Sequence, residues 1–193
     1  MTTTHDPLRA RLERWAELVA LGRAVDLGDP VHVSMLAESV NVFFNGARYE
    51  SDGLGCDEVD RWATPLEFIT RDAGDCEDFA IAKYFTLRAA GIDMGRLRLL
   101  YAKVLPGRMP HMVLAYHPTP DAEPQILDNL TSQINPLSEC GYLVPVYAFN
   151  EARVWLFRDD GTPVDVCAAG TLVLWRTLLE RVAQEQQPVG ALA

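Results

Sequence analysis

Several features that would indicate a membrane protein or a nucleic-acid-binding protein are missing from this sequence of 193 residues. No apolar run approaches the roughly 20 residues that a membrane-spanning helix needs. The chain has 17 basic residues against 27 acidic ones, a formal net charge of −10, and its bases form no block. This balance argues against nucleic acid or an anionic membrane surface as the main partner.

A recognisable export signal is also missing. Residues 1–7 read MTTTHDP and contain neither a basic segment nor an apolar segment behind it. The printed sequence therefore predicts either a protein that stays inside the cell or one whose signal lies upstream of Met1 or was removed.

Cysteine pairs with metal-ligand spacing are missing too. The chain has four cysteines and no CxxC pair, which argues against a structural zinc site. We expect Cys56, Cys140 and Cys167 to behave as small buried hydrophobic residues. The sequence leaves a disulfide among them open, although a domain of this size does not need one.

The composition that remains is that of an ordinary globular domain. Hydrophobic residues make up 49% of the chain and charged residues 23%, which suits one domain with a sizeable core. We expect a single domain over residues 1–193. Within it, residues 1–29 would form an N-terminal helical extension, residues 30–160 the core and residues 171–186 a C-terminal helix.

The periodicity of apolar residues changes between the two halves of the chain and predicts the fold class. Helices are predicted at residues 7–21, 31–44, 62–69, 75–90 and 171–186. Strands are predicted at residues 97–104, 112–116, 125–129, 145–149 and 154–157. Helices followed by an antiparallel meander define an α+β fold. The helix at 75–90 is apolar nearly all round, so we expect it to lie buried against the sheet.

The segment with the clearest chemical signal is Gly74-Asp75-Cys76-Glu77-Asp78, which opens that central helix. A thiol in the first turn of a helix lies near unpaired backbone N–H groups and the positive end of the helix dipole. Both favour the thiolate, which is the nucleophilic form of cysteine. Cys76 is therefore a candidate nucleophile.

A nucleophilic cysteine needs a base and a group that orients the base. Of the four histidines, His111 is the best placed, because it opens the predicted strand at 112–116. If that strand and the next form a hairpin with its turn near Asp121, His111 lies opposite residues 129–131, one diagonal neighbour from Asp128. We therefore predict a Cys76–His111–Asp128 triad. A strand-end histidine and a turn aspartate without catalytic roles are the alternative.

The acids around Cys76 require their own explanation. Asp75 can cap the helix and Asp78 can complete a variant capping box, but capping does not explain Glu77. Anions this close raise the pKa of a thiol. A bound cation would relieve that conflict, and carboxylates suit a hard ion such as Ca²⁺. A calcium site is therefore an expectation beside the capping interpretation.

Five segments of the chain recur in a known order in one family of bacterial enzymes. They are residues 40–45 (VNVFFN), 60–65 (DRWATP), 74–80 (GDCEDFA), 111–114 (HMVL) and 127–130 (LDNL). With these segments the chain resembles the bacterial transglutaminase-like cysteine proteinases, the family of the LapG-type periplasmic proteases. The similarity covers about residues 30–160. The GDCED block together with HMVL and LDN is a specific combination, whereas GDC alone would be weak.

The resemblance implies a papain-like, transglutaminase-type core and a role for each matching residue. Cys76 would be the nucleophile, His111 the base and Asp128 the orienting acid. The family depends on Ca²⁺, which Asp75, Glu77 and Asp78 would hold here. Trp62 would line the oxyanion region, although a core aromatic is the simpler interpretation. The backbone N–H of Cys76 is the more secure oxyanion donor.

The resemblance also implies a biological setting. Members of the family cleave a large surface adhesin near its N-terminus, at a double-alanine site, and so release cells from a biofilm. The implied compartment is the periplasm. An implied partner is an inner-membrane receptor that senses cyclic-di-GMP and sequesters the protease.

Two other functions fit the same residues. In acyl transfer, an amine would replace water at the thioester while the catalytic residues stay the same. A non-catalytic module would keep the fold and bind calcium or a partner. The loss of Cys76, His111 or Asp128 would have favoured that module, and all three are present.

Overall fold

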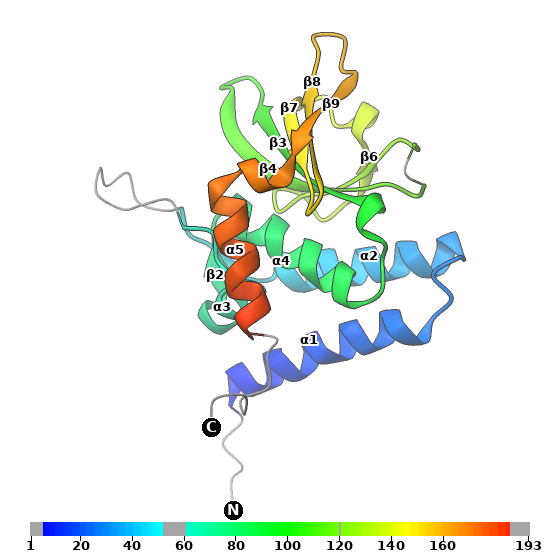
Figure 1. The fold of residues 1–193 in the computed structure, drawn as a ribbon. Helices are drawn as coiled ribbons and strands as arrows, with labels where there is room; N and C mark the ends of the chain where they lie inside the picture. Colours follow the sequence, from blue (N-terminus) through cyan, green and yellow to red (C-terminus); the bar gives the residue numbers. More distant parts are fainter. Residues whose placement is uncertain (1–5, 52–60, 120, 186–193) are drawn as a thin grey trace, which may run out of the picture.

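The computed structural model describes residues 6–51, 61–119 and 121–185. These residues form an α+β fold in which helices pack on one face of an antiparallel sheet (Figure 1). The helices are α1 (Pro7–Ala24), α2 (Pro30–Asn45), α3 (Pro65–Arg71), α4 (Cys76–Ala89) and α5 (Val173–Glu185). None of the helices in these ranges is long and apolar enough to span a membrane.

The main sheet has seven strands: β3 (Leu97–Val104), β4 (Met109–Tyr116), β5 (Gln125–Leu127), β6 (Asn135–Pro136), β7 (Leu143–Phe149), β8 (Arg153–Phe157) and β9 (Pro163–Ala168). Their spatial order is β6-β5-β4-β3-β7-β8-β9, with antiparallel pairing throughout. The chain therefore meanders from β3 out to β6, returns to the middle at β7, and meanders out again. Two short strands, β1 (Arg48–Tyr49) and β2 (Ala73–Gly74), pair in parallel beside the start of α4.

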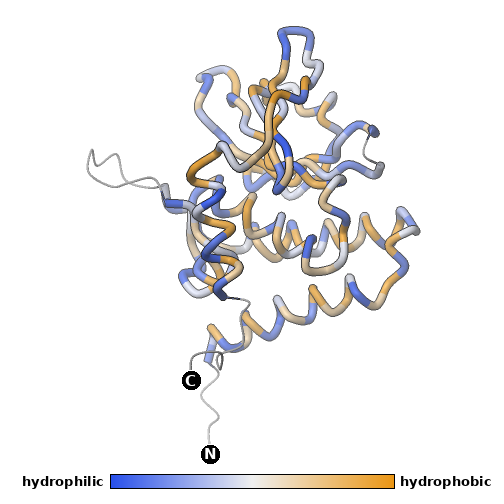
Figure 2. Tube along the Cα trace, in the orientation of Figure 1, coloured by the Kyte–Doolittle hydropathy of each residue, from blue (hydrophilic) through white to orange (hydrophobic). Residues whose placement is uncertain are grey.

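Helix α4 is the centre of the larger hydrophobic core. Its residues Phe79, Ile81, Tyr84 and Leu87 are at most 2% exposed, as the apolar pattern predicted. The strands contribute alternate side chains to two cores, because successive residues of a strand point to opposite faces. Leu114 lies in the core under the helices, and its neighbour Val113 lies in a smaller core on the other face. Figure 2 shows the hydrophobic colour concentrated along α2, α4 and the strands.

Local sequence signals account for the helix starts around α4. Thr64 caps α3 with a complete capping box, since Glu67 accepts the Thr64 N–H while its own N–H bonds the Thr64 hydroxyl. Pro65 occupies the first helical position, where its missing N–H costs nothing. Asp75 caps α4 by accepting the N–H of Asp78 at 3.3 Å. These caps fix the direction in which α4 leaves β2.

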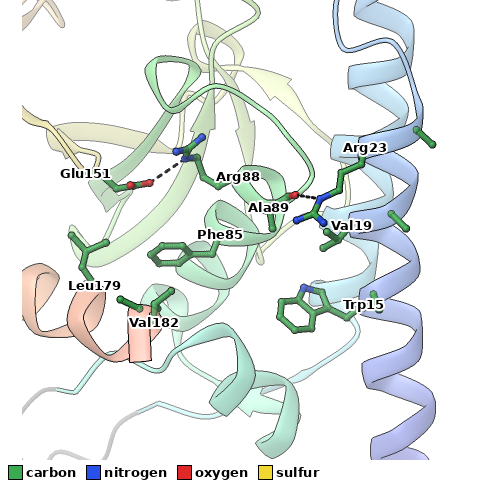
Figure 3. Close-up of a pocket in the computed structure, with 13 residues that line it drawn as sticks. Trp15, Val19, Arg23, Phe85, Arg88, Ala89, Glu151, Leu179 and Val182 are labelled. Carbon is green, nitrogen blue, oxygen red and sulfur yellow. Dashed lines mark hydrogen bonds and ion pairs between the residues drawn. The ribbon is translucent and has the colours of Figure 1, made fainter. Parts of the chain in front are cut away.

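Helix α1 lies outside the core and is joined to α4 by polar contacts. The Trp15 indole donates to Thr86 Oγ1 at 2.8 Å, and Arg23 Nε donates to the Ala89 carbonyl at 2.8 Å. Between α1, α4 and α5 runs a groove of about 990 Å³. Figure 3 shows Trp15, Phe85 and Val182 facing this groove from the three helices.

The sheet differs from the sequence prediction at several places. Strand β5 ends at Leu127 rather than at 129, because Asp128 Oδ1 accepts the N–H of Leu130 and turns the chain. Strands β6 and β9 were not predicted. In β9 no residue is fully buried, so its edge position leaves only a weak alternating pattern. Strand β7 pairs with β3 instead of β6, so the sheet is not the simple meander that was expected.

The last helix also begins later than predicted. It starts at Val173 instead of residue 171, since Ala169–Thr171 form a separate 3₁₀ turn and Leu172 is extended. The other helix boundaries agree with the prediction within three residues.

Gly74 is required where β2 meets α4. A Cβ atom on Gly74 would lie 2.6 Å from Asp78 Oδ2 and 2.9 Å from the Phe68 ring. We expect Gly74→Ala to lower the free energy of unfolding by about 1–3 kcal/mol, because the buried contacts must shift. Gly141→Ala is the control, since a Cβ there meets nothing within 4 Å and the change should stay within about 0.5 kcal/mol. Equal effects in urea denaturation would contradict this packing argument.

Candidate active site

Cys76 is the first residue of α4 and faces strand β4. Its side chain is buried, at 8% exposure, and Asp75 caps the helix immediately before it. Burial and the neighbouring Glu77 raise the pKa of the Cys76 thiol, and a hydrogen bond from the backbone of Met112 on β4 works against that rise. The contact joins the helix start to the strand residue that follows His111. The fold thus brings two segments 36 residues apart to one place.

His111 and Asp128 form a buried pair. His111 Nε2 lies 2.7 Å from Asp128 Oδ1, and the two side chains are 6% and 0% exposed. The β4–β5 ladder confirms the predicted hairpin and ends at the pair Leu114–Leu127, so His111 and Asp128 meet just beyond the last paired residues. Because Nε2 is taken by Asp128, Nδ1 is the ring nitrogen that remains for proton exchange with Cys76.

Asp128 is held by more groups than the sequence predicted. The Tyr142 hydroxyl donates to Asp128 Oδ2 at 2.8 Å, and the Leu130 N–H donates to Oδ1 at 2.9 Å. Asn45 on α2 donates to the Asp128 carbonyl at 2.8 Å. No local pattern marks Tyr142 or Asn45, since both reach Asp128 from distant segments. Asn45 entered the sequence analysis only as the last residue of the segment at 40–45.

The charge of Asp128 is stabilised by these partners. Burial by itself would raise the pKa of Asp128, but the hydrogen bond and charge of His111, followed by Leu130 and Tyr142, hold it below its ordinary value. Burial and the Asp128 charge raise the pKa of Tyr142, so this phenol stays a donor. The carboxylate can therefore orient His111 through a charge-assisted hydrogen bond.

The acids beside Cys76 oppose thiolate formation. The thiol lies 2.8 Å from Glu77 Oε2 and donates to it. Burial raises the pKa of Cys76, and the charges of Glu77 and Asp75 raise it further. Tyr49 on β1 belongs to the same neighbourhood, because burial and then the charges of Cys76, Asp75 and Glu77 raise its pKa. The sequence analysis had not singled out Tyr49.

Carboxylate oxygens such as those of Asp75 and Glu77 are suitable ligands for Ca²⁺, but the described residues supply only part of a ligand set. Asp75 and Glu77 flank the thiol, whereas Asp78 is 3% exposed and accepts the Ala63 N–H at 2.7 Å with one oxygen. Within residues 6–51, 61–119 and 121–185, no three His, Cys, Asp or Glu side chains gather around a common point. Calcium takes six to eight oxygen ligands, so Asp75 and Glu77 could form one side of such a site.

Trp62 packs as a core aromatic against the sheet. Its ring stacks on Phe149 with centroids 5.8 Å apart, and its carbonyl accepts from Arg181 on α5 at 2.9 Å. The indole Nε1 is buried and has no hydrogen-bond partner in the described part of the chain. The packing fits the simpler of the two interpretations, while the unpaired N–H keeps the oxyanion interpretation open.

Of the other described histidines and cysteines, His32 and His117 lie apart from this cluster, whereas Cys140 bonds Tyr142, the partner of Asp128. His117 bonds the Ala122 carbonyl at 2.8 Å beyond the far end of β4, and His32 lies on α2 near Asp26. His5 and Cys56 are outside the described residues. The described cysteines, Cys76, Cys140 and Cys167, are all free.

A buried cysteine at the start of a central helix, packed on an antiparallel sheet that carries a His–Asp pair, defines a class of protein. This is the arrangement of a transglutaminase-like cysteine peptidase. The helix supplies the thiol, and the sheet supplies the base with its carboxylate.

Comparison with known proteins shows that the chain belongs to the bacterial transglutaminase-like cysteine proteinases, the family that residues 31–160 match. It is similar to the solved structure of Legionella pneumophila LapG in its EGTA-treated form, with 39% identity and a TM-score of 0.77 over 91% of this chain and 89% of that one. The calcium-bound form of that LapG matches with 39% identity and a TM-score of 0.76 over 90% of each chain. No curated protein matches the sequence.

The buried His111–Asp128 pair makes the free energy of unfolding depend on pH. Since the folded pKa of Asp128 is lowered, its stabilising contribution is present above the ordinary value of about 4 and is lost as pH falls through the folded value. We expect Asp128→Asn to lower the free energy of unfolding at pH 7 by about 3 kcal/mol. The further loss of stability on lowering the pH should be smaller in this variant than in the wild type.

Asp165→Asn is the control for this experiment. Asp165 pairs with Arg153 at the surface, with side chains 42% and 47% exposed, so its loss should cost at most about 1 kcal/mol. Urea unfolding of the three proteins between pH 3 and pH 7 measures both quantities. Equal losses from the two substitutions would show that the His111–Asp128 pair does not support the fold.

Proposed function

We propose that the chain is a calcium-dependent cysteine endopeptidase with Cys76 as nucleophile, His111 as base and acid, and Asp128 as the orienting carboxylate. The observation that carries this proposal is the buried 2.7 Å contact between His111 Nε2 and Asp128 Oδ1 on the strand whose next residue, Met112, bonds the Cys76 sulfur. A structural histidine would need neither a fully buried carboxylate nor a position beside a thiol.

The proposed reaction has two halves, and His111 transfers protons in both. The Cys76 proton passes to Nδ1 of His111, and the sulfur attacks the peptide carbonyl. His111 then protonates the leaving amine, and a thioester remains on Cys76. In the second half, His111 takes a proton from water as the water attacks the thioester, which releases the acid and restores the thiol. The Cys76 N–H at the helix start would stabilise the oxyanion, with Trp62 as a further candidate.

Calcium would act on the charges around the thiol. The Glu77 and Asp75 carboxylates keep the proton on Cys76, and a divalent cation on them would remove that opposition. The solved LapG forms, one calcium-bound and one EGTA-treated, support the choice of metal. Asp78 remains a candidate ligand by the resemblance alone.

The substrate and setting are proposed by resemblance. We propose that the enzyme cleaves a large surface adhesin near its N-terminus at a double-alanine site, and so controls biofilm attachment. The proposed compartment is the periplasm, and a cyclic-di-GMP-sensing inner-membrane receptor is the proposed regulatory partner. Acyl transfer to an amine would use the same residues, and measuring amine incorporation against peptide cleavage separates the two.

Removing the nucleophile tests the peptidase. We expect Cys76→Ala to abolish cleavage of an adhesin N-terminal fragment that contains a double alanine, and His111→Gln to lower kcat by about a thousandfold or more. Cys167→Ser is the matched control, because Cys167 lies half-buried on the edge strand β9. Retention of full cleavage by Cys76→Ala, measured by gel electrophoresis, would end the proposal. If a thiol probe labels Cys76 no faster than Cys140, the non-catalytic binding module is favoured.

Removing calcium tests the metal separately. We expect EGTA to stop cleavage and to lower the Tm, and added Ca²⁺ to restore both, with about 2.7 kcal/mol of stabilisation at a hundredfold excess over Kd. Glu77→Gln should lose the Tm response to calcium. Glu180→Gln, an exposed carboxylate on α5, should keep it. The calcium proposal fails if differential scanning fluorimetry gives the same Tm in EGTA and in calcium for the unmodified chain.

A further inference from the structure

The backbone around Asp128 is held by contacts that lie outside the sheet. Strand β5 ends at Leu127, and the last β4–β5 pair joins Leu114 to Leu127. Asp128 therefore lies beyond the paired part of the hairpin, where the ladder hydrogen bonds no longer fix the chain. The position of its carboxylate depends on what holds residues 128–132.

Two asparagines of helix α2 bind this segment. Asn45 Nδ2 donates to the carbonyl of Asp128 at 2.8 Å and to the carbonyl of Thr131 at 3.1 Å. Asn41, one helical turn earlier, donates through Nδ2 to the carbonyl of Ser132 at 3.3 Å. Residues four apart lie on the same face of a helix, so both amides reach the segment from one side.

The turn that Asn45 holds also carries the hydrogen bond to the proposed base. Asp128 Oδ1 accepts the N–H of Leu130 at 2.9 Å and lies 2.7 Å from His111 Nε2. One carboxylate oxygen thus closes the turn and contacts the histidine. Because Asn45 bonds the carbonyls of residues 128 and 131 together, it fixes the turn from outside. A change in the turn would move this oxygen relative to His111.

The two asparagines are costly as packing residues. Asn41 is 0% exposed. The Oδ1 atoms of Asn41 and Asn45 are both buried and have no hydrogen-bond partner among the described residues. A buried polar atom without a partner costs about 1–3 kcal/mol, and an apolar side chain of similar size would avoid this cost. The N–H donors of the amides, rather than their volume, are therefore what these positions supply.

We propose that Asn45, assisted by Asn41, is a positioning residue for the catalytic pair, which holds the Asp128 turn so that its carboxylate meets Nε2 of His111. This inference rests on the proposed function, because Asn45 acts on the reaction only through the base. It also gives a task to the segment at 40–45, whose asparagines are Asn41 and Asn45 and which the proposed reaction does not otherwise use.

Proton NMR of the full chain in calcium buffer tests the position of the pair without any substrate. A ring N–H that donates to a buried carboxylate makes a strong hydrogen bond and gives a deshielded proton line, which His111→Gln should lack. We expect Asn45→Ala and Asn45→Asp to shift this line upfield or remove it, because neither new side chain donates to the two carbonyls. Asn41→Ala should shift it less, since the Asn41 bond is longer and ends at Ser132.

Turnover of p-nitrophenyl acetate measures the consequence for the reaction. The ester acylates Cys76, and hydrolysis of the thioester needs His111 in place. A small misplacement of a catalytic group can cost up to about a hundredfold in rate. We therefore expect both Asn45 variants to lower kcat by between about tenfold and a hundredfold, together with the change in the proton line.

Asn150→Ala is the matched control. Asn150 is 2% exposed and holds the turn between β7 and β8 by bonds to Met94, Ala152 and Arg153. Its removal should lower the free energy of unfolding, measured in urea, at least as much as Asn45→Ala does. The proton line and kcat should nevertheless stay at their wild-type values.

The outcomes separate the inference from the function on which it rests. Folded Asn45 variants with the wild-type line and the wild-type kcat would overturn it, and so would an Asn150→Ala protein that loses both readouts equally. If Asn45→Ala does not fold, Asn45→Asp decides by the same criterion. Turnover retained by Cys76→Ala would contradict the nucleophile alone. The proton line should persist in that variant, so the effect of Asn45→Ala on the line still decides the inference there.

Discussion

The packing of helix α4 on strand β4 is the contact on which the rest of the site depends. It places the first turn of the helix, with Cys76, beside the strand segment that carries His111 and Met112. The helix is held in this position by burial of almost its whole surface and by the Asp75 cap at its start. A shift of α4 by one residue along its axis, about 1.5 Å, would move the Cys76 thiol away from the β4 segment that carries His111 and Met112.

The site concentrates charge in a place where charge is expensive. A buried carboxylate, Asp128, contacts the buried histidine His111, and two further carboxylates, Asp75 and Glu77, flank the thiol of Cys76. Such an arrangement is stable only when each charge has a partner of opposite sign or a network of donors. Asp128 has that network in His111, Tyr142 and Leu130. The thiol has instead two anions, which is why a cation fits the proposed function so well.

The two halves of the fold have different tasks in this arrangement. The helical half buries and orients the nucleophile, and α2 reaches across with Asn45 to hold the backbone of Asp128. The sheet half carries His111 and Asp128 on one hairpin, whose paired residues end directly before Asp128. Helix α5 closes the assembly by bonding the carbonyl of Trp62 through Arg181. The placement of Cys76, His111 and Asp128 therefore depends on contacts between parts of the chain that are far apart in sequence.

The sequence by itself determined the class of fold, the central buried helix and the hairpin that brings His111 to Asp128. Those features follow from periodicity, caps and residue spacing, which are local properties of a chain. Only the tertiary structure decided the return of β7 beside β3, the edge strand β9, and the approach of Tyr142 and Asn45 to Asp128. Long-range packing places these groups, and no pattern within a few residues records it. The acids beside Cys76 were visible in the sequence, but only the fold showed Glu77 holding the thiol proton.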